Sequence, residues 1–127
     1  MGFLLLFAMI PRLGTLQTAE QTFNLISEAL QKGDAAKLSL FFDDQLEVYT
    51  GGTPRIYSNV QAKYVMQEFF QKNPPRSFML LHRGRSDNIL YGIGSYVSYQ
   101  GRWDVSFFLR FDKTRYVIEQ LRFELVQ

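Results

Sequence analysis

The second half of the chain alternates between apolar and polar side chains, which is the pattern of strands that bury one face. Three short breaks containing glycine, asparagine or aspartate separate the alternating runs, and such residues favour tight turns. We therefore expect an antiparallel sheet of four consecutive strands, with the earlier part of the chain packed across its inner face. The predicted strands are Ser77–Arg83, Ile89–Tyr99, Arg102–Phe111 and Arg115–Leu125.

The first half of the chain has apolar residues at helical spacing and two capping boxes, Thr18–Gln21 and Ser58–Gln61. In each box the hydroxyl of the first residue can accept a hydrogen bond from the backbone amide of the glutamine three residues later. The glutamine side chain can in turn accept from the backbone amide of the first residue. Gly33 can adopt the left-handed conformation that ends a helix, and Asp34 can cap the next one. The predicted elements are a helix from Thr18 to Gly33, a helix over Ala35–Phe41, strands at Leu46–Thr50 and Pro54–Tyr57, and a helix from Ser58 to Asn73.

This order of elements predicts an α+β domain with helices on one side of an antiparallel sheet. Three stretches resemble the nuclear transport factor 2-like superfamily, a cystatin-like cone fold. They are "EALQKGDAAKLSLFFDDQLEV", "YSNVQAKYVMQEFFQKNPPRSFMLLHRG" and "YGIGSYVSYQGRWDVSFFLRFDKTRYVIEQLRFE". The segment "FFQKNPPRSFMLLHRG" also resembles a family of small exported bacterial proteins of unknown function. The resemblance implies three N-terminal helices packed in the concavity of a curved antiparallel sheet, and it implies no particular activity.

Length and composition narrow the functional classes. A chain of 127 residues can build one domain with a real core and is too short for two. It has no cysteine, which excludes disulfides and thiol chemistry. The formal net charge is only +2, too small to predict binding to nucleic acid or membranes. We therefore expect no nucleic-acid partner and no cofactor.

The N-terminus contains an unbroken apolar run, Phe3–Ile10, which Pro11 stops. It is much shorter than the roughly 20 residues of a membrane-spanning helix and suits the apolar middle of an export signal. No lysine or arginine precedes the run, and Gln17 stands where a small residue would favour cleavage after Ala19, so a buried or partner-facing segment is the alternative. The prediction is an export signal over residues 1–19 and one domain over 20–127, periplasmic or secreted, with no membrane span after signal removal. Without a signal the protein would be cytoplasmic.

His82, the only histidine, and Asp104 are the candidate catalytic residues. Unbroken alternation places His82 on the same face as Leu80, but both faces of that strand are apolar, so the pattern does not identify the inner one. An inward His82 could act as an acid or base with Asp104, Tyr57 or Tyr49 as its partner. The alternatives are a histidine hydrogen-bonded at a strand end and an Asp104 paired with a cross-strand arginine. A small-molecule lyase or isomerase using both residues is thus the second functional hypothesis.

The aromatic content of 16% predicts a cavity wall as well as a core. Gly92 and Gly94 fall on one strand face, where missing side chains permit bending or close approach of a helix. The leading hypothesis is a non-enzymatic binding module for a small apolar ligand, or a concavity filled by its own side chains. A homodimer through the outer sheet face is the third. The predicted pocket-lining residues are Phe69, Phe78, Leu80, His82, Tyr91, Trp103 and Phe107.

Two charged patterns have simpler interpretations than a functional site. The acidic cluster Asp43-Asp44-Glu47 lacks the spacing of a calcium loop, and we expect a solvated helix end and no metal site. Arginines interleaved with aromatic residues in the last four strands could bind single-stranded nucleic acid. The low net charge favours an outer sheet face on which arginine stems cover aromatic rings beside Glu119 and Glu124.

Overall fold

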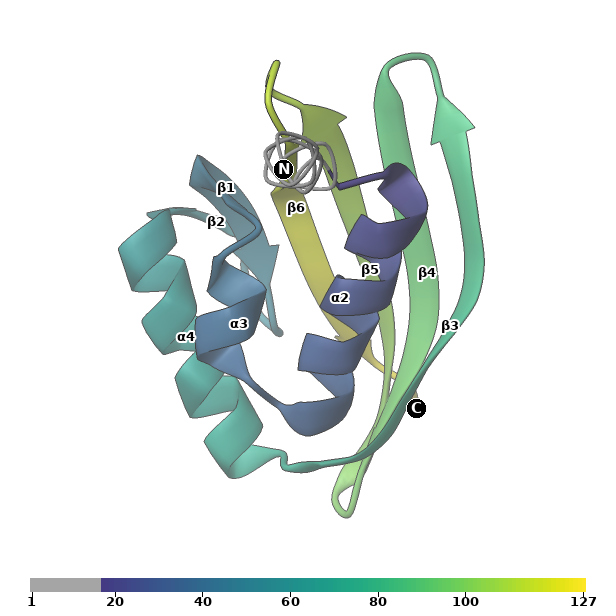
Figure 1. Cartoon of the computed structure of the whole chain (residues 1–127). Coiled ribbons are helices and arrows are strands. Elements are labelled where there is room, and N and C mark those ends of the chain that lie inside the picture. Colours follow the sequence, from purple (N-terminus) through teal and green to yellow (C-terminus); the bar gives the residue numbers. More distant parts are fainter. Residues whose placement is uncertain (1–16) are drawn as a thin grey trace, which may run out of the picture.

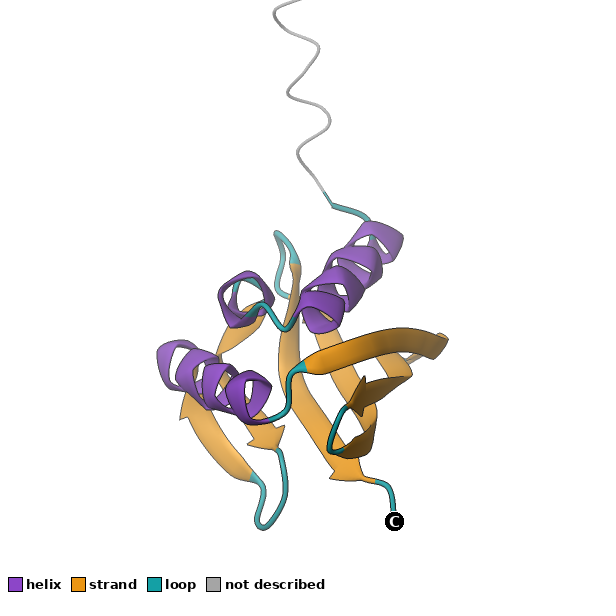
Figure 2. Ribbon diagram, turned by 90° about the horizontal axis from the view of Figure 1, so that it is seen from below, coloured by secondary structure: helices purple, strands orange, loops and turns teal. Residues whose placement is uncertain are grey.

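The computed structural model describes residues 17–127, which form three helices and one six-stranded sheet. The helices gather on one side of the curved sheet (Figure 1, Figure 2). The apolar run Phe3–Ile10 lies outside the described residues. Within the described residues, no helix combines the length and apolarity needed to cross a membrane. The elements are α2 (Ala19–Lys32), α3 (Ala35–Ser39), β1 (Phe42–Tyr49), β2 (Arg55–Ser58), α4 (Asn59–Lys72), β3 (Pro75–Ser86), β4 (Ile89–Ser98), β5 (Gly101–Phe111) and β6 (Tyr116–Leu125).

Both predicted helix starts are confirmed. The Thr18 hydroxyl accepts from the Gln21 amide at 3.1 Å, and the Gln21 side chain accepts from the Thr18 amide at 3.0 Å. Ser58 and Gln61 make the same pair of bonds at the start of α4. Gly33 ends α2 with φ of 62°, the left-handed conformation that glycine adopts without strain. Local sequence signals therefore place the ends of these helices.

The three predicted helices are present, but the length of one and their position in the chain order differ from the prediction. The helix α3 has five residues and ends at Ser39, two residues before the predicted end. The helix α4 follows β1 and β2, so the helices within residues 17–127 do not all precede the sheet. The helices α2 and α4 cover different parts of its inner face, α2 over β3 and β4, and α4 over β1 and β2.

The strand order is β2-β1-β6-β5-β4-β3, and the last four strands form the predicted antiparallel meander. The prediction of a wholly antiparallel sheet is wrong in one place, because β1 runs parallel to β6. The strand β1 also begins at Phe42, four residues before its predicted start. Phe42 is 1% exposed, and Phe41 accepts a backbone hydrogen bond from Ile118 at 2.6 Å. Contacts with β6, about seventy-five residues along the chain, thus extend β1.

The core lies between the helices and the concave face, and its centre is an aromatic cluster around Phe69 of α4. The Phe69 ring centroid lies 4.6 Å from that of Phe123, 5.4 Å from Trp103, 5.7 Å from Tyr96 and 6.0 Å from Phe70. Tilted and edge-on pairs of this kind add about 0.5–1.5 kcal/mol each beyond the buried area. The cluster therefore ties α4 to the sheet.

Tyr96 is the polar member of this cluster and has no exposed surface. Its hydroxyl donates to the carbonyl oxygen of Asn73 at 2.6 Å, where α4 ends. Burial raises the pKa of the Tyr96 hydroxyl well above its usual 10, so it stays protonated and keeps donating. This bond fixes the turn between α4 and β3 against the sheet.

Gly92 and Gly94 lie on the inner face of β4, where aromatic rings from the two neighbouring strands occupy the space of their missing side chains. A Cβ atom at Gly92 would lie 2.5 Å from Cζ of Phe107, and one at Gly94 would lie 2.5 Å from Cζ of Phe78. The sequence suggested that these glycines permit bending of the strand or close approach of a helix. The sheet is curved (Figure 1), and the groups that approach these glycines are rings of β5 and β3 rather than a helix.

Candidate functional site

A β-bulge in β3 decides where His82 points. The register pairs Leu80 with Gly94 and then His82 with Ile93, so Leu81 is the extra residue. A bulge shifts the alternation by one residue. Leu80 faces inward, whereas His82 lies on the outer face with Ile93. The expectation that Leu80 and His82 share a face is therefore wrong. Arg83 consequently turns to the inner side, where its guanidinium lies 5.7 Å from the ring of Phe23.

The structure does not bring His82 and Asp104 together. His82 is exposed on β3, and its polar contact is the Tyr91 hydroxyl at 3.4 Å. Asp104 is exposed on β5, and its partner is Arg102 at 3.7 Å, on the same strand and not across the sheet. The strand β4 separates β3 from β5, which puts their backbones about 10 Å apart.

The other two proposed partners of His82 are also elsewhere. Tyr49 lies at the end of β1, with the Arg122 guanidinium 4.5 Å from its ring centre. Tyr57 belongs to β2, at the opposite edge of the sheet from β3, and packs against the core. His82 therefore has Tyr91 as its aromatic neighbour and no carboxylate partner within the described residues.

The seven predicted pocket residues do not line one cavity. Phe69 and Trp103 border one groove, and Phe78, Leu80 and His82 border another. The remaining two lie apart from both grooves, Tyr91 on the outer face beside His82 and Phe107 fully buried against Phe23. The predicted aromatic wall is thus mostly a filled core that opens in separate places.

The first groove has a volume of about 470 Å³ and lies between α4, the ends of β1 and β6, and the start of β5. Phe69 and Trp103 form its floor, each 7% exposed. The edge-on contact between their rings holds both in place. We name this the Trp103 groove. Its full lining is Tyr49, Thr50, Gly51, Val65, Glu68, Phe69, Lys72, Asn73, Trp103, Glu124, Leu125 and Gln127.

Several residues of the Trp103 groove were not predicted, although the sequence carried a signal for two of them. Val65 stands four residues before Phe69 on the same face of α4, and Asn73, the residue that caps the end of α4, donates its amide to the Phe69 carbonyl. Tyr49 and Leu125 have no such signal. They reach the groove because β1 pairs with β6 and the end of β6 pairs with Trp103.

A second groove, of about 510 Å³, separates α2 from the free edge of β3. On the α2 side it is lined by Asn24, Ser27 and Gln31. The Gln31 side chain crosses to the strand and donates to the carbonyl oxygen of Phe78 at 3.2 Å. We name this the α2–β3 groove. Its β3 side runs from Phe78 to Arg83.

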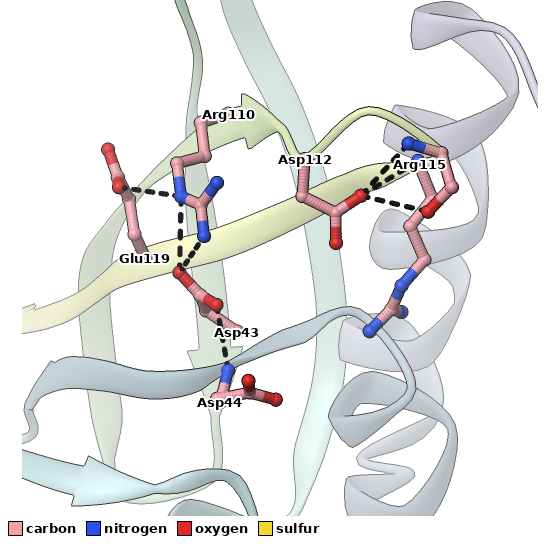
Figure 3. A network of polar contacts seen from close by, with 7 residues as sticks. Asp43, Asp44, Arg110, Asp112, Arg115 and Glu119 are labelled. Atoms are coloured by element: carbon pink, nitrogen blue, oxygen red, sulfur yellow. Dashed lines mark hydrogen bonds and ion pairs between the residues drawn. The ribbon is translucent and has the colours of Figure 1, made fainter.

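The outer face over β1, β6 and β5 carries a network of ion pairs (Figure 3). Arg110 of β5 donates through Nη2 and Nε to the Asp43 carboxylate, at 2.8 and 3.2 Å. Its Nε lies 3.4 Å from Glu119 of β6. The hydrogen bond to Asp43 is the main reason that the pKa of Arg110 is raised above its ordinary value. The prediction that Asp43 lies at a solvated helix end is therefore wrong.

Other predicted features of this face are present. Arg122 lies 3.5 Å from Glu124 and 3.9 Å from Glu47, and its guanidinium lies over the ring of Tyr49. Beside the network, the Asp112 carboxylate accepts from the amides of Arg115 and Thr114 (Figure 3). These bonds lower the pKa of Asp112 and close the turn between β5 and β6.

The chemistry that these groups can perform is limited by their placement. The outer-face carboxylates are engaged with arginines, and none of them lies beside His82. In the part of the chain that the structure describes, no three histidine or acidic side chains gather in a way that could hold a metal ion. The Trp103 groove, with its aromatic floor and polar rim, and the more polar α2–β3 groove are the candidate binding sites.

Residues 23–124 match the family described as "Domain of unknown function (DUF4783)". A family member from Bacteroides ovatus has a similar crystal structure, with a TM-score of 0.79 and 26% identity over 90% of this chain and 99% of that one. A second, from Bacteroides uniformis, has a TM-score of 0.78 and 23% identity over 82% and 96%.

A nuclear transport factor 2-like protein of unknown function from Cytophaga hutchinsonii gives a TM-score of 0.64 at 12% identity, covering 89% of this chain and 94% of that one. No curated protein matches the sequence. The match over most of the chain and the shared architecture agree, so the chain belongs to the DUF4783 family of domains of unknown function and has a nuclear transport factor 2-like fold.

Proposed function

We propose that the domain is a non-enzymatic binding module that holds a small, mostly apolar ligand in the Trp103 groove. The observation that carries this proposal is the placement of Phe69 and Trp103 at the floor of an open groove, with both rings held by the aromatic cluster. Ligand sites are concave and mostly apolar, with a few polar groups that orient the ligand. The rim supplies such groups through Thr50, Asn73 and the Glu68–Lys72 pair.

The geometry gives less support to the lyase or isomerase hypothesis. General acid–base chemistry needs two groups within hydrogen-bond reach of one substrate. His82 and Asp104 lie on the exposed outer face of different strands, separated by β4. Neither borders the Trp103 groove. A folded His82→Ala protein is accordingly expected to keep ligand binding unchanged.

Native mass spectrometry of the full-length protein, purified without denaturation from its expression host, tests the proposal. The expected result is a protein ion with an added small-molecule mass, which collisional activation removes. The apolar run Phe3–Ile10 motivates a further proposal, that the protein is exported. In the same spectrum, a protein mass that corresponds to a chain starting near Glu20 would support export. The mass of the chain with its N-terminus intact would contradict it.

The ligand recovered in that experiment can be used to test whether the Trp103 groove is the binding site, because Trp103 is the chain's single tryptophan. We expect addition of the ligand to change the fluorescence of Trp103. Thr50→Phe fills the groove from its rim and should weaken binding at least about tenfold, because the large side chain competes for the ligand's volume.

Thr53→Phe is the matched control, since Thr53 is exposed in the same loop and does not border the groove. Equal binding by the wild type and both variants would reject the Trp103 groove as the site. The absence of any bound mass, together with no fluorescence response in a fragment screen, would reject the binding-module proposal.

A second candidate function is self-association through the outer sheet face, for which the exposed apolar residues Met79 and Ile93 argue. Met79 is 64% exposed and Ile93 is 41% exposed, and they lie on neighbouring strands. Sedimentation velocity should show a dimer whose population falls when Ile93 is replaced by aspartate. The control is Val60→Asp, because Val60 is an exposed residue of α4; this substitution should leave the dimer intact. A wild-type monomer at high concentration would contradict this candidate.

A further inference from the structure

The two edges of the sheet differ. The edge strand β2 has four residues and follows Pro54, whereas β3 has twelve residues and only β4 as its neighbour. In Figure 1, β3 is the outermost strand on the right. A long edge strand presents a row of backbone donors and acceptors that can pair with another chain. The free edge of β3 is therefore the larger unpaired surface of the sheet.

The edge of β3 already accepts one hydrogen bond from outside the sheet. The Gln31 side chain of α2 donates to the Phe78 carbonyl at 3.2 Å, so this carbonyl points away from β4 and into the α2–β3 groove. In an antiparallel strand, outward-pointing groups recur at every second residue, and the bulge at Leu81 shifts this alternation by one residue within the groove. The groove follows the strand from Phe78 to Arg83, which at about 3.3 Å per residue gives room for a short extended segment.

The α2 side of the groove offers further polar groups to such a segment. Asn24 presents an exposed amide, and the buried Ser27 hydroxyl has no hydrogen-bond partner within the described residues. The exposed Asn24 amide can contact the backbone or side chains of a chain lying between α2 and β3, whereas the Ser27 hydroxyl is covered. The groove is thus lined by hydrogen-bonding groups on both sides.

Unpaired positive charge follows the same strand. Arg76, Arg83 and Arg85 of β3 have no carboxylate within 4.0 Å in the described structure, and residues 1–16 contain no acidic residue. The outer-face arginines, by contrast, all have such partners: Arg102, Arg110 and Arg122. Arg83 and Arg85 stand two residues apart, which places them on one face of the strand.

We propose that the free edge of β3 binds an extended acidic peptide segment as an added strand, in the α2–β3 groove. Acidic side chains at alternate positions of the peptide would face Arg83 and Arg85, while its backbone pairs with the edge of β3. A second copy of this chain fits less well as the occupant. Pairing β3 with β3 would bring arginines near arginines, and like charges on paired strands are destabilising.

The probe is a fluorescein-labelled octapeptide in which glutamate alternates with threonine and valine, followed by fluorescence anisotropy with the full-length protein. Arg85→Glu should weaken binding at least about fivefold, because it replaces an attraction by a repulsion. Arg55→Glu is the matched control, since Arg55 is exposed on the opposite edge strand and has no ion pair in the described structure. It changes the net charge equally and should alter the affinity less than about twofold.

A second peptide with proline at alternate positions tests the added strand, because proline has no backbone N–H to donate. It should bind at least about tenfold more weakly. Equal losses in both arginine variants, or equal binding of both peptides, would overturn the proposal in favour of non-specific charge attraction. No binding at millimolar protein would also overturn it. Tighter binding of a single-stranded oligonucleotide at the same salt concentration would assign the arginines to a nucleic-acid surface instead.

Discussion

Replacing Phe69 with alanine is expected to lower the free energy of unfolding by about 3–5 kcal/mol. The Phe69 ring packs between Phe123, Trp103 and Tyr96, so its removal leaves a cavity between α4 and the sheet. These neighbours belong to β4, β5 and β6, whose positions hydrogen bonding fixes, and they cannot collapse to fill it. Urea denaturation followed by far-ultraviolet circular dichroism measures the loss without depending on the altered surroundings of Trp103.

Phe111→Ala is the matched control for this prediction. Phe111 is 52% exposed at the end of β5, and its one aromatic neighbour among residues 17–127 is Tyr116, with ring centroids 5.1 Å apart. The expected loss is about 1 kcal/mol or less. Similar losses for Phe69→Ala and Phe111→Ala would contradict the assignment of Phe69 to the centre of the core.

Gly94→Ala is expected to lower the free energy of unfolding by about 1–3 kcal/mol. An added Cβ would lie 2.5 Å from the carbonyl oxygen of Met79 and 2.5 Å from Cζ of Phe78. The carbonyl belongs to the paired strand β3, and the Phe78 ring is 3% exposed, so neither can move without disturbing the sheet or the core. Urea denaturation of the purified variant, at unchanged helix and strand content, measures the effect.

Gly84→Ala is the matched control for the glycine prediction. Its added Cβ would also meet an atom at 2.5 Å, but that atom is the hydroxyl oxygen of Tyr91, at the far end of a partly exposed side chain. The Tyr91 ring can swing outward, so we expect a change within about 0.5 kcal/mol. Both substitutions replace glycine by alanine in a strand, and the general preference for alanine there cancels in the comparison. If Gly84→Ala lowered the free energy of unfolding as much as Gly94→Ala, the loss at Gly94 would not be due to its crowded position between Met79 and Phe78.

Local signals in the sequence identified the helix ends and the meander because their causes are local. A capping box needs only residues three apart, as at Thr18 and Ser58, and the left-handed end of α2 needs only Gly33. The alternation in β5 separates Trp103 and Phe107 from Asp104, and the structure shows that the face with Trp103 is the buried one. The same local signals did not give β1 its full length, because its first residues are held by β6.

The candidate sites depended on information that no local pattern carries. One extra residue at Leu81 moved His82 to the outer face and Arg83 to the inner side, and a bulge of this kind has no reliable local signature. The sequence also grouped Phe69 and Phe78 in one pocket because both are aromatic. They border different grooves, since α4 and α2 lie over different strands.

The sequence by itself determined the α+β class, the capping of α2 and α4 and the antiparallel meander, because propensities and periodicity act over a few residues. Only the tertiary structure decided the parallel pairing of β1 with β6, the Asp43–Arg110 contact across the sheet and the division of the aromatic residues between a filled core and the Trp103 groove. Each of these joins residues far apart in the chain, where packing and strand register select the partners.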